Sequence, residues 1–125
     1  MSTVTTTQET FNDVVVSNDI VLIDFWASWC GPCRMFAPVY EAASENHEDV
    51  TFAKVDTEAQ PGLAQAFQIT SIPTLMVIRE GVVLHSQAGA LPAPALEKLI
   101  EAVRDLDMDD VRAQIAAEKS EAADA

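Results

Sequence analysis

The sequence has few basic residues, and this shortage limits what the chain can bind. It has 7 lysines and arginines against 20 aspartates and glutamates, which gives a net charge of −13. Nucleic acid and anionic membrane surfaces would repel a chain of this charge. We therefore expect it to bind neither of them.

Long apolar runs and targeting segments are also missing. No stretch approaches the ~20 apolar residues that a membrane-spanning helix needs. Residues 1–9 have neither the basic region nor the apolar core of a secretory signal peptide, so we expect a cytoplasmic protein. A hydrophobic content of 49% with only 4 glycines in 125 residues indicates one folded domain with a substantial core.

Cysteine is scarce, and the two that occur stand three positions apart, at Cys30 and Cys33. Residues 20–27 before them are apolar, β-branched and aromatic, which predicts a buried strand. The pair therefore lies at a strand-to-helix junction, with Gly31 in the turn and Pro32 at the start of the helix. The helix is indicated by apolar residues at helical spacing, namely Met35, Phe36, Val39, Tyr40 and Ala43.

This position favours redox chemistry over its alternatives. The free N–H groups and partial positive charge of a helix start favour a thiolate at Cys30, whereas Cys33 should be more buried and less ionised. One thiol can then attack a disulfide and the other can resolve the product. A zinc site would need two more ligands, and the only histidines, His47 and His85, lack ligand spacing. A purely structural disulfide would close too short a loop to remove much chain entropy.

The segment from Asp24 to Met35, DFWASWCGPCRM, resembles the active-site segment of the thioredoxin family. The resemblance extends over about residues 4 to 105. It implies the thioredoxin fold, an α/β domain with a mixed central sheet flanked by helices on both faces. The further matches follow in the family's order: Ala37-Pro38, Lys54-Val55-Asp56, Pro61-Gly62, Ile72-Pro73-Thr74 and Gly89-Ala90.

The remaining sequence pattern agrees with this fold and predicts the element order βαβαβαββα. Thr6 or Thr7 should cap the first helix, and Pro38 should bend the second. Both histidines should lie exposed, and the threonine-rich start forms either an edge strand or a loose end. The later elements are expected as strands at 50–55, 74–78 and 83–87 and helices at 63–67 and from residue 91.

We divide the chain into a thioredoxin domain, residues 1–106, and an acidic, partly helical tail, residues 107–125. The tail holds six acidic and two basic residues. Asp107 should cap its helix. Because the apolar stripe is thin, we expect a solvated appendage; the stripe consists of Met108, Val111 and Ile115.

Asp24 is the one charged residue in the predicted strand, on the same face as Leu22 and Trp26, so it should be buried. Burial disfavours the charged form of a carboxyl group. The residue is either a core acid satisfied by its neighbours or a base of raised pKa. The family resemblance implies the second role, that of a proton acceptor for Cys33, with Lys54 close to it.

The resemblance also implies a substrate-docking surface beside the cysteines. Ile72-Pro73 matches the family's cis-proline loop, which leaves the Ile72 backbone free to pair with an extended substrate. Trp29 is either a core residue or, more consistently with its place before Cys30, a cover over the site. Thr57 is more polar than the aliphatic residue common there. The expected surface consists of Trp29, Gly31, Pro32, Ile72, Pro73, Gly89 and Ala90.

Together with the family's activity, these residues predict a protein-disulfide reductase. Cys30 would attack the substrate, Cys33 would resolve the mixed disulfide, and a thioredoxin reductase would restore the dithiol. We expect a monomer that needs neither a metal nor another cofactor. Three rival hypotheses are a non-catalytic binding module, a zinc protein, and an oxidase or isomerase of the same fold. Gly31-Pro32 between the cysteines resembles the reducing members.

Overall fold

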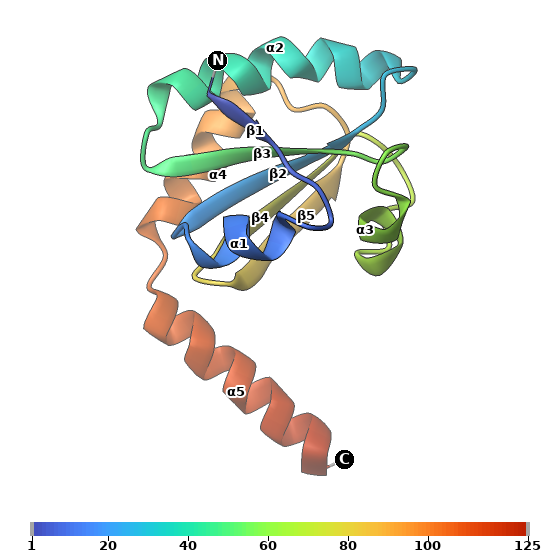
Figure 1. Ribbon diagram of the computed structural model, residues 1–125. Helices are drawn as coiled ribbons and strands as arrows, with labels where there is room; N and C mark the ends of the chain where they lie inside the picture. Colours follow the sequence, from blue (N-terminus) through green and yellow to red (C-terminus); the bar gives the residue numbers. More distant parts are fainter. Residues whose placement is uncertain (1, 125) are drawn as a thin grey trace.

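A five-stranded mixed sheet forms the centre of the molecule, with helices on both of its faces (Figure 1). The computed structural model describes residues 2–124, with side chains as far as residue 120. The strands are β1 (Thr3–Thr5), β2 (Ile20–Trp26), β3 (Val50–Asp56), β4 (Thr74–Arg79) and β5 (Val82–Ala88). The helices are α1 (Phe11–Val16), α2 (Gly31–Asn46), α3 (Pro61–Ala66), α4 (Ala93–Asp105) and α5 (Met108–Asp124).

The strands lie in the order β1-β3-β2-β4-β5 across the sheet. β1 and β2 both run parallel to β3, whereas β4 runs antiparallel to β2 and to β5. This topology confirms the predicted fold class and element order. It also shows that residues 3–5 of the threonine-rich start form a short edge strand.

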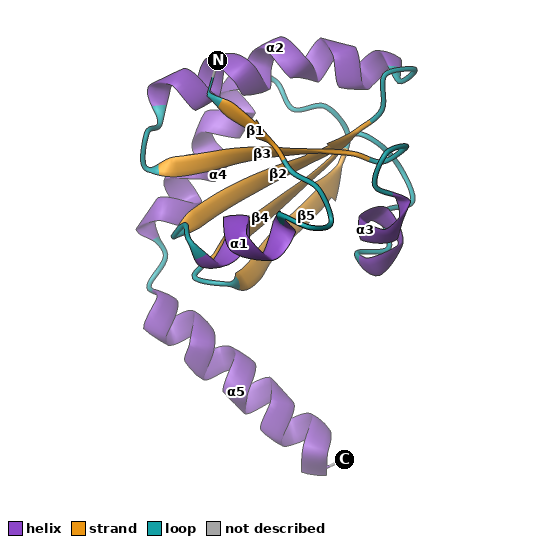
Figure 2. Cartoon of the chain, viewed as in Figure 1, coloured by secondary structure: helices purple, strands orange, loops and turns teal. Residues whose placement is uncertain are grey.

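The alternation of side chains along the central strand β2 divides the core into two layers. Leu22 packs with residues of α2 and α4, among them Tyr40 and Ile100. Ile23 packs on the opposite face, which α1 and α3 cover (Figure 2). The buried stripe of α2 begins at Cys33 and continues through Tyr40. The same helix face therefore fills one core layer and carries one of the two cysteines.

A reciprocal pair of hydrogen bonds between two threonines precedes α1, but the N-cap residue of α1 is Thr10 and not the predicted Thr6 or Thr7. The Thr7 N–H donates to Thr10 Oγ1 at 2.9 Å, and the Thr10 N–H donates to Thr7 Oγ1 at 3.3 Å. The Phe11 N–H then bonds to the Thr7 carbonyl oxygen at 2.8 Å. Helical hydrogen bonding thus begins at Thr7, although regular helix starts only at Phe11.

The prediction that both histidines are exposed is wrong. The side chain of His47 is only 13% exposed, because α4 packs beside the end of α2 and brings two charged residues to it. His47 Nε2 lies 2.7 Å from Glu97 Oε2, and Arg104 Nη2 lies 3.0 Å from His47 Nδ1. His85 is half-buried on the edge strand β5, where Nε2 contacts Gln87 Oε1 at 2.5 Å.

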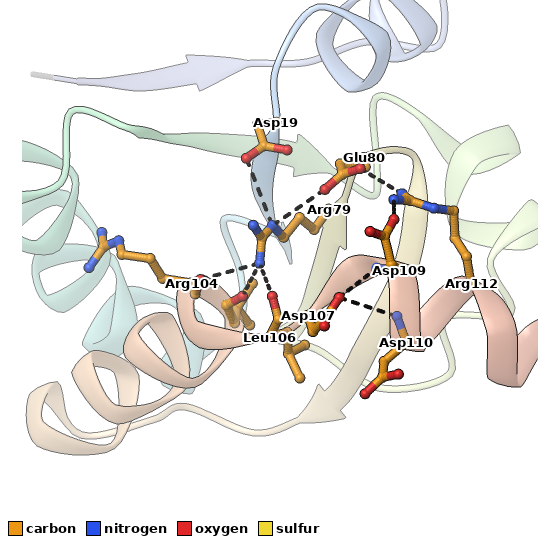
Figure 3. A network of polar contacts seen from close by, with 10 residues as sticks. Asp19, Arg79, Glu80, Arg104, Leu106, Asp107, Asp109, Asp110 and Arg112 are labelled. Carbon is orange, nitrogen blue, oxygen red and sulfur yellow. Dashed lines mark hydrogen bonds and ion pairs between the residues drawn. The ribbon is translucent and has the colours of Figure 1, made fainter.

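The last helix, α5, extends away from the sheet (Figure 1), but its first turns are fixed to the domain (Figure 3). Arg79, at the end of β4, donates through Nη1 to the carbonyl oxygens of Val103 at 2.8 Å and Leu106 at 2.9 Å. These carbonyls lie at the end of α4 and in the link to α5. Arg112 on α5 donates through Nη1 to Glu80 Oε1 at 2.6 Å.

The expectation of a wholly solvated tail is therefore wrong at its start. Met108 is 5% exposed, whereas residues 116–120 are all exposed. Asp107 caps the helix as predicted, because its Oδ1 accepts from the Asp109 N–H at 3.0 Å. The thin apolar stripe is thus buried at Met108 and half-buried at Val111 and Ile115, whereas the acidic end beyond it is exposed.

This division of α5 predicts different effects for two truncations. Ending the chain after Leu106 should lower the free energy of unfolding by about 2 kcal/mol, because it removes the buried Met108 side chain. Ending it after Ala113 keeps Met108 and Arg112 and should leave stability nearly unchanged. Guanidinium unfolding midpoints measure both variants. Equal losses in the two variants would show that α5 packs along its whole length.

Candidate active site

The two cysteines lie where β2 ends and α2 begins, as predicted. Cys30 is the N-cap residue of α2, and its sulfur accepts a hydrogen bond from the Cys33 N–H at 3.2 Å. Pro32 stands at the start of the helix, where its missing N–H has no intrahelical partner to lose. A disulfide bond joins the two sulfurs, with the Cα atoms 5.2 Å apart. This geometry sets a closed redox pair at the positive end of the helix dipole.

Both cysteines are buried in this oxidised form. Cys30 is 4% exposed and Cys33 is 3% exposed, so the expected difference in burial between them is absent. The two cysteines lie in an apolar cluster with Ala27 that Trp26 and Ile72 flank. Cys30 Sγ lies 3.6 Å from the Ile72 carbonyl oxygen.

Asp24 stands on the core face of β2, as the strand pattern predicts. It is 1% exposed, and its Oδ1 atom has no hydrogen-bond partner among the described residues. Burial raises the pKa of Asp24 to about 7, although the charge of Lys54 acts in the opposite direction. The carboxyl group therefore changes its charge near neutral pH. A general acid or base works best in that range.

Lys54 faces Asp24 from the neighbouring strand. The two residues are direct partners in the parallel register of β2 and β3. Lys54 Nζ also lies 5.0 Å from the centroid of the Trp26 ring, which attracts a cation. The ammonium group thus lies over the Trp26 ring, and its charge lowers the pKa of Asp24.

The loop before β4 reaches the cysteines from another part of the chain. The Ile72–Pro73 peptide bond is cis, as the family resemblance implies. The Gly89 N–H donates to the Pro73 carbonyl oxygen at 2.8 Å, which joins this loop to the end of β5. Pro73 itself is buried, and its part in substrate docking stays a prediction. The exposed members of the expected surface are Trp29, Pro32, Gly89 and Ala90, with Gly31 and Ile72 half-buried.

Trp29 lies directly before Cys30 and is 65% exposed, which excludes a role in core packing. Its indole Nε1 donates to Glu58 Oε1 at 2.6 Å. Glu58 follows β3 and is absent from the residues that the sequence singles out. No pattern along the chain connects two loop residues 29 positions apart, and only the parallel pairing of β2 with β3 brings their loops together.

The comparisons with known proteins agree with this geometry. Residues 2–102 match the family model described as Thioredoxin. This chain belongs to the thioredoxin family. A Streptomyces coelicolor protein named "Putative thioredoxin 2" is 57% identical over 121 residues, which cover 97% of this chain and 90% of that protein. A solved structure of a mutant thioredoxin from Halobacterium salinarum has 36% identity and a TM-score of 0.79, and the match covers 85% of this chain and 94% of that one.

A further relative carries two activities in its name. The bifunctional thioredoxin reductase/thioredoxin of Mycobacterium leprae is 47% identical over 87 residues, which cover 69% of this chain and 19% of that protein. The Streptomyces match leaves only four of the 125 residues here outside the alignment, so it must extend into α5.

Members of the thioredoxin family are protein-disulfide oxidoreductases, and the disulfide-bonded Cys30-Cys33 pair of this chain is the redox centre of that chemistry. The hypothesis of a non-catalytic binding module is therefore set aside.

The two histidines that a zinc site would need make their contacts elsewhere, with Glu97 and Gln87. In the described part of the chain, no three His, Cys, Asp or Glu residues are grouped as metal ligands. None of the described helices combines the length and apolarity needed to cross a bilayer.

Thr57, which departs from the thioredoxin pattern, makes a contact within the chain, and so does Arg34, which follows Cys33. The Thr57 hydroxyl donates to the Trp26 carbonyl oxygen at 3.1 Å, so its polar group faces the end of β2. Arg34 Nη1 donates to the Ser28 carbonyl oxygen at 2.8 Å. Arg34 thereby supports the turn that precedes Cys30.

The raised pKa of Asp24 predicts a pH-dependent effect of Asp24→Asn on stability. Between the unfolded value near 4 and the folded value of about 7, the folded state binds more protons, so Asp24 destabilises the parent as pH rises. The variant removes this burden and should be roughly 2–4 kcal/mol more stable above pH 7. The gain should vanish below pH ~4, where the carboxyl group is protonated in both states. Denaturant unfolding at several pH values measures it, and a variant less stable than the parent at pH 8 would contradict the assignment.

Proposed function

We propose that this chain is a thioredoxin that reduces disulfides in other proteins and carries electrons to them from a reductase. The observation that supports it most is the placement of Cys30 at the N-cap of α2, with the buried acid Asp24 on the adjoining strand. The helix start stabilises a thiolate, and the acid supplies a proton-accepting group that titrates near pH 7. Gly31-Pro32 between the cysteines favours the reducing direction over an oxidase or isomerase.

The first step is attack on the substrate. In the reduced protein, the Cys30 thiolate attacks one sulfur of the substrate disulfide and forms a mixed disulfide, and the other substrate sulfur leaves as a thiolate. The Cys33 N–H, which donates to Cys30 Sγ at 3.2 Å, stabilises negative charge on that sulfur.

The second step is resolution by Cys33. Its thiol gives a proton to the Asp24 carboxylate, and its sulfur then attacks Cys30 Sγ. The bond between Cys30 and the substrate breaks, and the second substrate sulfur leaves as a thiolate. Two electrons have passed to the substrate, and the Cys30-Cys33 disulfide remains. The positive charge of Lys54, the register partner of Asp24, stabilises the charged carboxylate between turnovers.

The substrate docks on the exposed rim around the disulfide. Trp29, Gly31, Pro32, Ile72, Gly89 and Ala90 provide a largely apolar surface. The Ile72 backbone lies beside Cys30 Sγ, where an extended substrate strand would align its own cysteine. Glu58 holds the Trp29 indole and so sets the shape of one side of this rim.

The oxidised form is recycled by a thioredoxin reductase. The Mycobacterium leprae relative, whose name joins a reductase to a thioredoxin, supports this pairing. The protein works in the cytoplasm as a monomer and needs no cofactor beyond its own dithiol. Residues 1–106 form the domain that carries out the exchange. The tail, residues 107–125, takes no part in it, because α5 starts beside the end of β4, opposite the end of β2 that carries the cysteines (Figure 1).

The experiment that tests this function is reduction of insulin disulfides in the presence of a thioredoxin reductase and NADPH, with two cysteine variants. The parent should reduce insulin, and both Cys30→Ser and Cys33→Ser should lose turnover. Cys33→Ser should accumulate mixed disulfides with target proteins, because Cys30 attacks but nothing resolves the bond. Cys30→Ser should trap nothing.

Protein truncated after Ala113 serves as the matched control and should reduce insulin at the parental rate. Equal trapping by the two cysteine variants would overturn the assignment of attacker and resolver. Failure of the parent to reduce insulin would overturn the reductase function itself.

A further inference from the structure

Tyr40 is the only tyrosine in the chain, and its hydroxyl contacts the backbone of two neighbouring strands. The residue is completely buried on α2. Its hydroxyl lies 3.0 Å from the Leu22 carbonyl oxygen on β2 and 2.7 Å from the Ala53 carbonyl oxygen on β3. A phenol carries one hydrogen, so this single donor is shared between two strands.

The two strands joined by this hydroxyl are those that carry the acid and the lysine of the site. Leu22 lies two residues before Asp24, on the same face of β2, and Ala53 directly precedes Lys54 on β3. Tyr40 in turn shares the buried face of α2 with Cys33, seven residues earlier, which is about two helical turns. One hydroxyl therefore connects the three elements that hold Cys33, Asp24 and Lys54.

Packing alone does not require the hydroxyl. The Tyr40 ring contacts Phe36 and Phe52, with centroids 5.5 and 5.2 Å away, and a phenylalanine would preserve both contacts. Burial and the nearby charges of Asp24 and Glu41 raise the pKa of Tyr40 well above its usual value. The phenol therefore stays neutral and acts as a hydrogen-bond donor.

We propose that Tyr40 is a positioning residue for the resolving step, whose hydroxyl fixes α2 to β2 and β3 and so sets Cys33 at the working distance from Asp24. The proposal rests on the proposed role of Asp24 as the proton acceptor for Cys33. Proton transfer depends steeply on the distance between donor and acceptor, so a small shift of α2 would slow resolution while attack by Cys30 proceeds normally.

The test follows both steps in one reaction of the reduced full-length protein with the aromatic disulfide DTNB. Attack by Cys30 releases one thionitrobenzoate, and attack by Cys33 on the mixed disulfide releases the second. Tyr40→Phe should leave the first phase unchanged and slow the second by about tenfold. The pH midpoint of the second phase should stay that of the parent, because burial and Lys54 set the pKa of Asp24.

Two control experiments distinguish a positioning role of the Tyr40 hydroxyl from a general loss of rigidity in α2. Ser44→Ala removes another buried hydroxyl of α2, which donates to the Glu41 carbonyl oxygen of the same helix at 2.6 Å, and should leave both phases unchanged. In an Asp24→Asn background, Tyr40→Phe should slow the second phase by much less than in the parent, because the acceptor that it positions is gone.

The failures of the two proposals can be told apart. A normal second phase in Asp24→Asn would remove the acceptor role and, with it, the role of Tyr40. A slow second phase in Asp24→Asn together with a normal one in Tyr40→Phe would overturn the role of Tyr40 alone. Equal slowing of both phases by Tyr40→Phe, or equal slowing in both backgrounds, would also overturn it.

Discussion

A carboxyl group buried without a hydrogen-bond partner for one of its oxygens is the constraint on which the site depends. Asp24 occupies a position that hydrophobic packing alone would give to leucine or valine, and desolvation raises its pKa to about 7. A single lysine, Lys54, offsets this effect only in part. The fold tolerates the energetic burden because β2 is the central strand, held by β3 on one side and β4 on the other.

The cysteines gain their chemistry from the same strand. β2 ends at Trp26 and the chain turns directly into α2, so that Cys30 receives the N–H groups of a helix start while Asp24 stays on the strand behind it. In the proposed mechanism, attack and resolution thus draw on different physical effects, a helix dipole for Cys30 and a desolvated acid for Cys33. The acidic tail lies at the other end of the sheet, where Arg79 and Arg112 fix its start.

Much of the fold and of the site could be predicted from the sequence because the patterns that indicate them are local. Alternation and helical spacing give the elements around Cys30, and one acid in an apolar strand identifies Asp24. Contacts between distant segments left no such signal. The bond of Trp29 to Glu58, the burial of His47 beside Glu97 and the docking of Met108 all depend on which loops and helices the sheet brings together. The cis bond before Pro73 matched the family motif, but the burial of Pro73 left no signal in the sequence.

Direct titration of Asp24 in the oxidised protein tests the central claim most simply. Carbon NMR of the side-chain carboxyl group follows protonation of this one residue, and Asp24→Asn identifies its signal. A midpoint at about pH 7 is the predicted result, because burial outweighs the charge of Lys54. A midpoint near 3.8, the ordinary value for aspartate, would contradict it. Asp24 would then be a charged acid at neutral pH with no raised affinity for a proton, and the proposed transfer from Cys33 would lose its support.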